Sequence, residues 1–203
     1  MHQTNLVLVR HGQSEWNERN LFTGWKNPDL TQLGVEEARQ AGRELEDLGY
    51  RFKMLFSSDL QRAQRTGDLI LDMMKNDLCK KIYDYRLNER NYGDLAGLNK
   101  DDARKRWGEK QVHIWRRSYD VSPPGGESLR DTAERVIPFF EEVISPELEE
   151  SGDVLIVAHG NSLRALVMKI EGLSTREIIE VEIKTGRPLC YQINEESIVR
   201  IQH

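Results

Sequence analysis

The sequence of 203 residues is poor in cysteine and has no long apolar run. Its two cysteines, Cys79 and Cys190, could pair in principle but lie far apart. The N-terminus lacks the apolar region of a secretion signal, so we expect reduced thiols in a cytoplasmic protein. Because no apolar stretch of about 18 residues exists, no membrane span is expected. Closely spaced cysteine and histidine sets are absent as well, which argues against a structural zinc site.

The charge balance narrows the choice of partners. A formal net charge of -5 argues against a general affinity for nucleic acid or acidic membranes. It leaves room for an anionic small molecule, since a local arginine cluster can lie inside an acidic protein. With 38% hydrophobic and 31% charged residues, the chain is typical of a globular protein with one substantial core. We therefore predict a single domain over residues 1–203.

Strand-like and helix-like segments alternate along the chain, without internal repeats or low-complexity stretches. This alternation predicts an α/β fold with a mostly parallel sheet. The short apolar runs at 5–10 and 154–158 are typical of strands covered on both faces. Further strands are expected at 53–58 and 189–193, and helices at 31–50, 59–77, 129–144 and from 160 onward.

Several residues mark where the expected helices begin, end or bend. Gly49 is expected to stop the first long helix. Ser128, followed three residues later by Asp131, predicts a helix N-cap after a loop over 122–128. Pro138 should kink or split the helix that follows. The apolar stripe of the first long helix is expected to comprise Val35, Ala38, Ala41, Leu45 and Leu48.

Two buried-looking strands end in the same way, with histidine followed by glycine. The first run leads into His11 and the second into His159. Ligands bind beyond the carboxyl ends of strands in open α/β sheets, and parallel neighbours would place both histidines there. A single histidine at a strand end is more often structural than catalytic. Two in matching contexts favour a shared site over two unrelated structural histidines.

The surrounding residue types favour metal-free phosphoryl transfer. No set of carboxylate or cysteine ligands at regular spacing accompanies either histidine. A neutral imidazole is a good nucleophile toward phosphorus, and arginine is suited to hold phosphoryl oxygens with paired hydrogen bonds. Arg10 precedes the first histidine, Arg62 follows the strand at 53–58, and Arg116 and Arg117 form a pair. Each arginine alone could instead be an ordinary solvated surface charge.

Five segments resemble one family along nearly the whole chain. They read LVLVRHGQSEWNERNLFTGWKNPDLTQLG, FSSDLQRAQRT, RLNERNYGDLAGLNK, WRRSYDVSPP and AHGNSLRALV. In this order they are similar to the cofactor-dependent (2,3-bisphosphoglycerate-dependent) phosphoglycerate mutases of the histidine phosphatase superfamily. The Arg-His-Gly motif alone would indicate only the superfamily. The resemblance implies an α/β fold of three layers, a mostly parallel sheet flanked by helices.

The resemblance also implies a role for each matching residue. His11 would be the nucleophile, and Glu89 the general acid and base for the substrate hydroxyl. Arg10, Asn17, Arg62 and His159 would surround the transferring phosphoryl group, where His159 stabilises transition-state charge. The remaining groups would hold the substrate's carboxylate and second phosphate: Thr23, Gly24, Tyr92, Lys100, Arg116, Arg117, Gly160 and Asn161, with Gln13 and Ser14 as further phosphate contacts. Without the resemblance, Tyr92 could be a packing residue and Lys100 a surface charge.

The activity implied is the interconversion of 3-phosphoglycerate and 2-phosphoglycerate in glycolysis and gluconeogenesis. It would proceed through phosphohistidine, with 2,3-bisphosphoglycerate as primer and intermediate and with no metal. The expected partners are small phosphoglycerates, with no nucleic acid and no membrane. A homodimer is expected, other oligomeric states staying open. Two alternatives are a phosphatase of the same superfamily and a non-catalytic binding protein, although the latter would be expected to have lost one of His11, Glu89 or His159.

The sequence departs from longer family members in two places. Only VSPPGG, residues 121–126, joins the Arg-Arg-Ser-Tyr-Asp segment to the next helix, where longer members carry an insertion. The sequence ends at SIVRIQH, without the mobile tail that would cover the site in longer relatives. We therefore expect either faster hydrolysis of the phosphoenzyme or bisphosphoglycerate than in tailed relatives, or another segment acting as the lid.

Overall fold

Strand β1 (Thr4–Arg10) lies inside a six-stranded sheet in the computed structural model, which describes residues 4–150, 152–194 and 197–201. The four strands β1 to β4 run parallel, β5 runs antiparallel to β1, and β6 runs antiparallel to β5. This confirms the mostly parallel sheet. The spatial order is β3 (Lys80–Tyr83), β2 (Met54–Ser57), β4 (Val154–Ala158), β1, β5 (Pro188–Asn194) and β6 (Ser197–Ile201).

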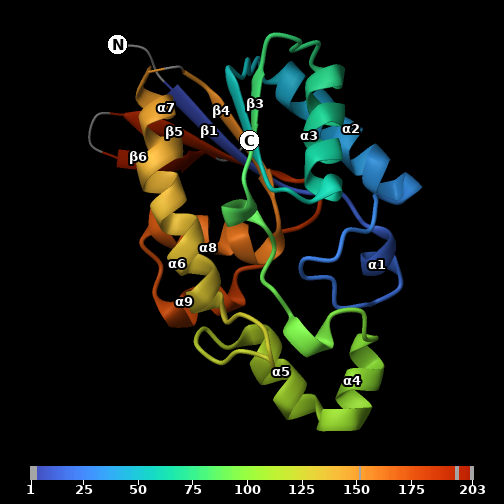
Figure 1. Cartoon of the computed structure of the whole chain (residues 1–203). Helices are drawn as coiled ribbons and strands as arrows, with labels where there is room; N and C mark the ends of the chain where they lie inside the picture. The colour runs from blue at the N-terminus through green and yellow to red at the C-terminus, as the bar shows by residue number, and fades with distance from the viewer. Residues whose placement is uncertain (1–3, 151, 195–196, 202–203) are drawn as a thin grey trace.

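Helices cover both faces of the sheet and complete the three layers (Figure 1). Because side chains alternate along a strand, β1 packs Leu6 and Leu8 against one helical layer and Val7 and Val9 against the other. All four side chains are fully buried, which explains the uninterrupted apolar run in the sequence. One layer contains α2 (Gln32–Asp47) and α3 (Gln61–Met73); the other contains α6 (Leu129–Phe139), α7 (Ser145–Glu150) and α8 (Gly160–Glu171).

A group of short helices lies away from the sheet, at the bottom of Figure 1. It is formed by α4 (Lys100–Trp107) and α5 (Glu109–Arg117), preceded by two short 3-10 turns at Tyr85–Leu87 and Gly93–Leu95. We call residues 84–127 the cap. The cap has a small core of its own with the loop after β1, made of Phe22, Leu95, Ala103, Val112 and Trp115. The remaining helices are α1 (Glu15–Glu18) and α9 (Thr175–Glu180).

The predicted helix signals are confirmed in most places. Ser128 and Asp131 form a reciprocal capping box at the start of α6, and Gly49, with a φ of +81°, follows Leu48, the C-cap of α2. The prediction that Leu48 belongs to the buried stripe is wrong, because α2 ends at Asp47 and Leu48 is 40% exposed. At Pro138 the helix does not stop. The α-helical pattern ends at Phe139 and a π-helical turn, Phe140–Ile144, continues it into α7.

Two further sequence expectations concern the thiols and the membrane. Cys79 and Cys190 are both free and buried, as expected for reduced thiols. Among the residues that the structure describes, no helix combines the length and apolar character needed to cross a membrane.

Candidate active site

The ends of β1 and β4 form the floor of the site. The two strands pair in register, with Arg10 opposite Ala158, and the His11 amide donates a hydrogen bond to the Ala158 carbonyl at 3.0 Å. The imidazole rings of His11 and His159 consequently lie 4.9 Å apart, centroid to centroid, and both side chains are buried. This confirms that the parallel strands bring the two histidines side by side.

The protonation pattern of His11 is set by its own loop. Its Nδ1 lies 2.7 Å from the Gly12 carbonyl oxygen. A carbonyl can only accept, so Nδ1 carries the proton in the neutral ring and Nε2 has the free lone pair. Burial first, and then the charges of Arg62 and Arg10, hold the pKa of His11 well below its usual value. The imidazole is therefore neutral at pH 7, the state in which it can attack an electrophile.

The loop that orients His11 has no room for a larger residue at Gly12. A Cβ added there would lie 2.1 Å from the carbonyl oxygen of Gly34, at the start of α2. The Gly12 amide donates to Thr66 Oγ1 on α3 at 3.1 Å. Close packing between β1, α2 and α3 thus fixes the carbonyl that accepts from His11.

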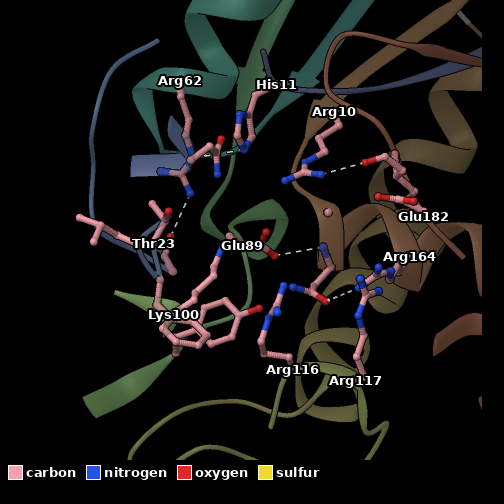
Figure 2. A pocket seen from close by; sticks show the side chains of 18 residues that line it. Arg10, His11, Thr23, Arg62, Glu89, Lys100, Arg116, Arg117, Arg164 and Glu182 are labelled. Carbon is pink, nitrogen blue, oxygen red and sulfur yellow. Dashed lines mark hydrogen bonds between the residues drawn. The ribbon is translucent and has the colours of Figure 1, made fainter. Parts of the chain in front are cut away.

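Arg62 occupies the first turn of α3 and faces the lone pair of His11 (Figure 2). Its Nε donates to His11 Nε2 at 3.3 Å, and its two terminal nitrogens donate to the carbonyls of Lys26 and Gly24. Gly24 has a φ of +54°, a conformation that favours glycine. Burial lowers the pKa of Arg62 to about 10, so the side chain stays charged at pH 7. A cation is therefore fixed beside the nucleophilic nitrogen.

His159 caps the end of β4 just before α8. Its Nε2 lies 2.7 Å from Ser58 Oγ, and its Nδ1 is buried without a partner among the described residues. Burial, followed by the charges of Arg62 and its neighbours, holds the pKa of His159 well below the usual value. The Nε nitrogen of Arg10 is likewise buried without a described partner. A buried donor costs free energy unless something satisfies it, so these atoms suit an anionic ligand.

Glu89 comes from the cap and reaches toward the start of α8. Its Oε1 accepts from the amides of Arg90 and Asn161, at 2.8 and 3.0 Å. Its carbonyl accepts from Trp25 Nε1 at 2.6 Å and from Arg135 at 2.9 Å. The described residues give Oε2 no hydrogen-bond partner. One carboxylate oxygen is thus fixed in place while the other is free to exchange a proton.

A cavity of about 200 Å³ joins His11, Arg62 and Glu89, whereas the fully buried ring of His159 is not among the residues that line it. Besides Arg10, His11, Arg62 and Glu89, the predicted residues that line it are Asn17, Thr23, Gly24, Tyr92, Lys100, Arg116, Arg117, Gly160 and Asn161. Figure 2 shows Arg116 and Arg117 on the side opposite Arg62 and His11. The structure therefore brings cations to both ends of one small cavity.

The cations of the cavity affect one another. The pKa values of Lys100 and Arg116 are lowered by burial first, and nearby positive charge lowers them further. For Tyr92, burial raises the pKa, but the charge of Arg90 and other cations outweighs it and the pKa is lowered overall. Like charges collected in a half-buried space repel one another, so a bound polyanion would relieve the repulsion.

Besides His159, the predicted phosphate contacts Gln13 and Ser14 lie outside the cavity lining. The Gln13 amide donates to Glu37 Oε2, and Gln13 Oε1 accepts from Thr31, the N-cap of α2. Ser14 is buried and forms a capping box with Asn17 at the start of α1. The backbone amide of Asn161 is also engaged, because it donates to Glu89. In this structure the backbone amides of Gln13 and Asn161 and the hydroxyl of Ser14 are engaged by neighbouring residues.

Sequence reasoning did not name several residues that line the cavity. Arg164 is one of them. Its guanidinium donates to Asn161 Oδ1 and to the Val181 carbonyl, and burial lowers its pKa to about 10. Its spacing of three from Asn161 on α8 was a usable signal. The others are Leu21, Phe22, Glu182 and Ile183. They come from loops, where no periodicity marks them.

Among the described residues, no group of three or more histidine, cysteine, aspartate or glutamate side chains is placed to hold a metal ion.

Comparison with known proteins defines the class. The model of the histidine phosphatase superfamily (branch 1) matches residues 6–199, so the chain belongs to this superfamily. Within it, the chain belongs to the family of the 2,3-bisphosphoglycerate-dependent phosphoglycerate mutases. A mutase of that name from Mesorhizobium japonicum is 58% identical over 194 residues, covering 96% of this chain and 94% of the relative. The one from Rhizobium meliloti is 57% identical, with 96% and 92% covered.

Solved structures share the fold at lower identity. One, described as mycobacterial hydrolase 1, is 25% identical with a TM-score of 0.85, covering 99% of this chain and 98% of that one. A mycobacterial glucosyl-3-phosphoglycerate phosphatase, in complex with VO3, is 26% identical with a TM-score of 0.83, covering 98% and 96%. The confirmed fold is thus found in proteins described as hydrolases as well as in the mutase family.

Proposed function

We propose that this protein interconverts 3-phosphoglycerate and 2-phosphoglycerate by phosphoryl transfer through His11. The observation that carries the proposal is the placement of Glu89 and the Arg116–Arg117 pair in the same cavity as His11 and Arg62. Moving a phosphoryl group onto a substrate hydroxyl needs a base for the hydroxyl proton and cations to hold the substrate's other anionic groups. The close mutase relatives support this assignment.

The cavity fits 2,3-bisphosphoglycerate by its charge. Two phosphates and a carboxylate require cations around the whole ligand. Arg10 and Arg62 lie near His11, and Lys100, Arg116 and Arg117 lie across the cavity. The buried Nε of Arg10 has no described partner and would gain one. When bound, 2,3-bisphosphoglycerate supplies the phosphoryl group that primes the enzyme.

In the first transfer His11 acts as the nucleophile. Its Nε2 lone pair forms the N–P bond while the P–O bond of the donor breaks, and Glu89 Oε2 protonates the leaving alkoxide. Arg62 and Arg10 neutralise charge on the phosphoryl oxygens, as phosphoryl transfer requires. The Gly12 carbonyl holds the proton on Nδ1 throughout, so the ring keeps its orientation when Nε2 is phosphorylated.

In the return transfer the same groups exchange roles. Glu89 Oε2 removes the proton from the free hydroxyl of a bound monophosphoglycerate. That oxygen attacks phosphorus, and the N–P bond breaks to restore the lone pair of His11. The phosphoryl group of His11 goes to O2 of 3-phosphoglycerate, and the phosphoryl group on O3 of the bisphosphoglycerate then goes to His11, which leaves 2-phosphoglycerate. Lys100, Arg116 and Arg117, across the cavity from His11, must release the ligand and bind it again in the other orientation between the two transfers.

A phosphatase of the same superfamily is the competing function, favoured by the hydrolase and phosphatase descriptions of the structural neighbours. A coupled assay with 3-phosphoglycerate separates the two. We expect 2-phosphoglycerate as product, stimulated by 2,3-bisphosphoglycerate and unaffected by EDTA. Inorganic phosphate as the only product would overturn the mutase. Loss of turnover with EDTA would overturn the metal-free mechanism.

The family resemblance supports three coarser proposals. We propose that residues 1–203 form one domain, that the protein is a homodimer, and that it acts in the cytoplasm with the other enzymes of glycolysis. Light scattering coupled to size-exclusion chromatography would test the homodimer, which a mass near the 23.6 kDa of one chain would overturn.

A further inference from the structure

Ser58 lies on the turn between β2 and α3, where it contacts the ring of His159. The Ser58 side chain is fully buried, and its Oγ lies 2.7 Å from Nε2 of His159. Nothing in the reaction described above uses this serine, although it contacts one of the two histidines of the site.

The hydrogen bonds around Ser58 determine where the proton between the two residues lies. Ser58 Oγ accepts from the amide of Leu60 at 3.2 Å. Its own hydrogen needs an acceptor, and among the described residues the only one in reach is Nε2 of His159. With the proton on Nε2, both the hydroxyl hydrogen and the Nδ1 nitrogen would be buried without a partner, whereas with the proton on Nδ1 only the Nδ1–H lacks one; each unsatisfied buried group costs free energy. The serine therefore donates and Nε2 accepts.

The direction of this hydrogen bond determines whether the other ring nitrogen of His159, Nδ1, carries a proton. The ring is neutral because burial lowers its pKa. A neutral imidazole has one proton, so an acceptor at Nε2 means a donor at Nδ1. Nδ1 is the buried nitrogen that lacks a described partner. Its N–H is thus preorganised for an anionic oxygen without the cost of charging a buried ring.

We propose that Ser58 is a positioning residue that selects the Nδ1–H tautomer of His159, so that neutral His159 donates a hydrogen bond to the transferring phosphoryl group. The proposal rests on the proposed phosphoryl transfer at His11. It assigns His159 a neutral donor role. The two histidines are then held in the same tautomer by opposite means. A backbone carbonyl accepts from Nδ1 of His11, and a hydroxyl donates to Nε2 of His159.

The neighbouring serine offers a matched control. Ser57 is equally buried and adjacent in sequence, but its Oγ donates its hydrogen bond to the carbonyl of Val157, at 2.8 Å, and not to His159. Removing either hydroxyl deletes one buried hydrogen bond. Ser57→Ala should therefore share any general loss of stability with Ser58→Ala, but not an effect on the His159 tautomer.

The first test is nitrogen NMR of the protein labelled with 15N-histidine, in which the His159 signals are identified by their loss in His159→Asn. In the unsubstituted protein at pH 7.5 we expect a protonated Nδ1 and an unprotonated Nε2. In Ser58→Ala we expect a shift toward the Nε2–H form, and in Ser57→Ala no change. A protonated Nε2 in the unsubstituted protein overturns the proposal, even if Ser58→Ala does not fold.

The second test is kinetic. We expect Ser58→Ala to lower kcat for phosphoryl transfer about tenfold, with KM within about twofold, because the lost donor acts on the transition state. Ser57→Ala should keep both constants. An unchanged kcat in Ser58→Ala overturns the role of Ser58 while leaving the mutase assignment intact. If the unsubstituted protein forms no 2-phosphoglycerate, the proposed function fails, and the NMR measurement still decides the tautomer.

Discussion

The two ends of the cavity are built in different ways. At the sheet, His11, Arg62 and His159 are almost completely buried, at 2%, 1% and 0% exposure, and the register of β1 with β4 sets the spacing of the two histidines. At the cap, Lys100 and Arg116 are half-buried on short helices that share a small core of their own. The sheet end is thus almost fully buried, while the cap end is more exposed to water.

This difference indicates that the sheet end carries out the phosphoryl transfer and the cap end binds the substrate. Bond making and breaking requires groups fixed to within fractions of an ångström, which a packed sheet provides. Binding the substrate, releasing it and binding it again requires cations that can change their position, which long side chains on exposed short helices allow. Glu89 bridges the two regions, because it belongs to the cap but is held by the Asn161 amide of α8. Four predictions test the division.

The largest effect is expected at the sheet end. His11→Ala removes the nucleophile, so we expect no phosphoenzyme and a fall in turnover by a factor of about 10⁴ or more. The measurement is incorporation of labelled phosphate from 2,3-bisphosphoglycerate, together with the mutase assay. His113→Ala, an exposed histidine on α5, is the matched control and should keep full activity. Residual labelling of His11→Ala would remove His11 as the nucleophile.

The bridging residue should give the next largest effect. In Glu89→Gln the amide oxygen can still accept from Arg90 and Asn161, so the fold is retained, but no proton can be taken up. We expect mutase turnover to fall by about 10² to 10⁴, with phosphate still accepted slowly from 2,3-bisphosphoglycerate. Steady-state turnover and single-turnover labelling measure the two parts. Turnover equal to that of the unsubstituted protein would contradict the acid and base role.

The cap end should respond mainly in binding. Arg116→Ala removes one charged contact to the substrate, a loss of about 1.5–3 kcal/mol that corresponds to a rise in KM of about 10- to 100-fold. The kcat should change much less, because the nucleophile and its cation are untouched. Lys110→Ala, exposed on the same helix, is the control. A fall in kcat with constant KM would mean that the cap also takes part in the transfer step.

The smallest effect concerns stability and pH. Burial lowers the pKa of His11 and of His159 in the folded protein. In the unfolded chain both histidines titrate at the ordinary value of 6.5, so below that pH the unfolded chain binds more protons than the folded chain. Stability therefore falls as pH drops from about 6.5 to 5, by at most about 1.4 kcal/mol per pH unit for each histidine. Urea unfolding in phosphate-free buffer measures this slope.

Histidine variants show whether His11 and His159 cause this pH dependence of stability. Replacing both histidines, in His11→Asn with His159→Asn, should flatten the slope between pH 6.5 and 5, and His113→Asn should not. Aspartates such as Asp84, whose pKa is lowered by hydrogen bonds from Arg86, titrate at lower pH and lie outside this window. An unchanged slope in the double variant would mean that the histidines are not buried in the neutral form.

The cap was the hardest region to predict. Its helix α4 buries only Ala103, so no apolar stripe distinguishes it from a charged loop. The short strand β3 was missed for the same reason, because its side chains are half-buried or exposed at the edge of the helix-covered sheet. By contrast β1, β4 and α8 were predicted well, since continuous burial makes their sequence uniformly apolar or strongly periodic.

The sequence by itself determined the mostly parallel character of the sheet, its two strands that end in histidine and glycine, and the family to which the chain belongs. These features are local, because burial imposes a pattern on consecutive residues. Only the tertiary structure decided how each group is oriented. Glu89 meets the Asn161 amide across 72 positions, and Ser58 meets His159 across 101. Such hydrogen bonds leave no periodicity in either segment, so their direction, and the proton positions that follow, required the fold.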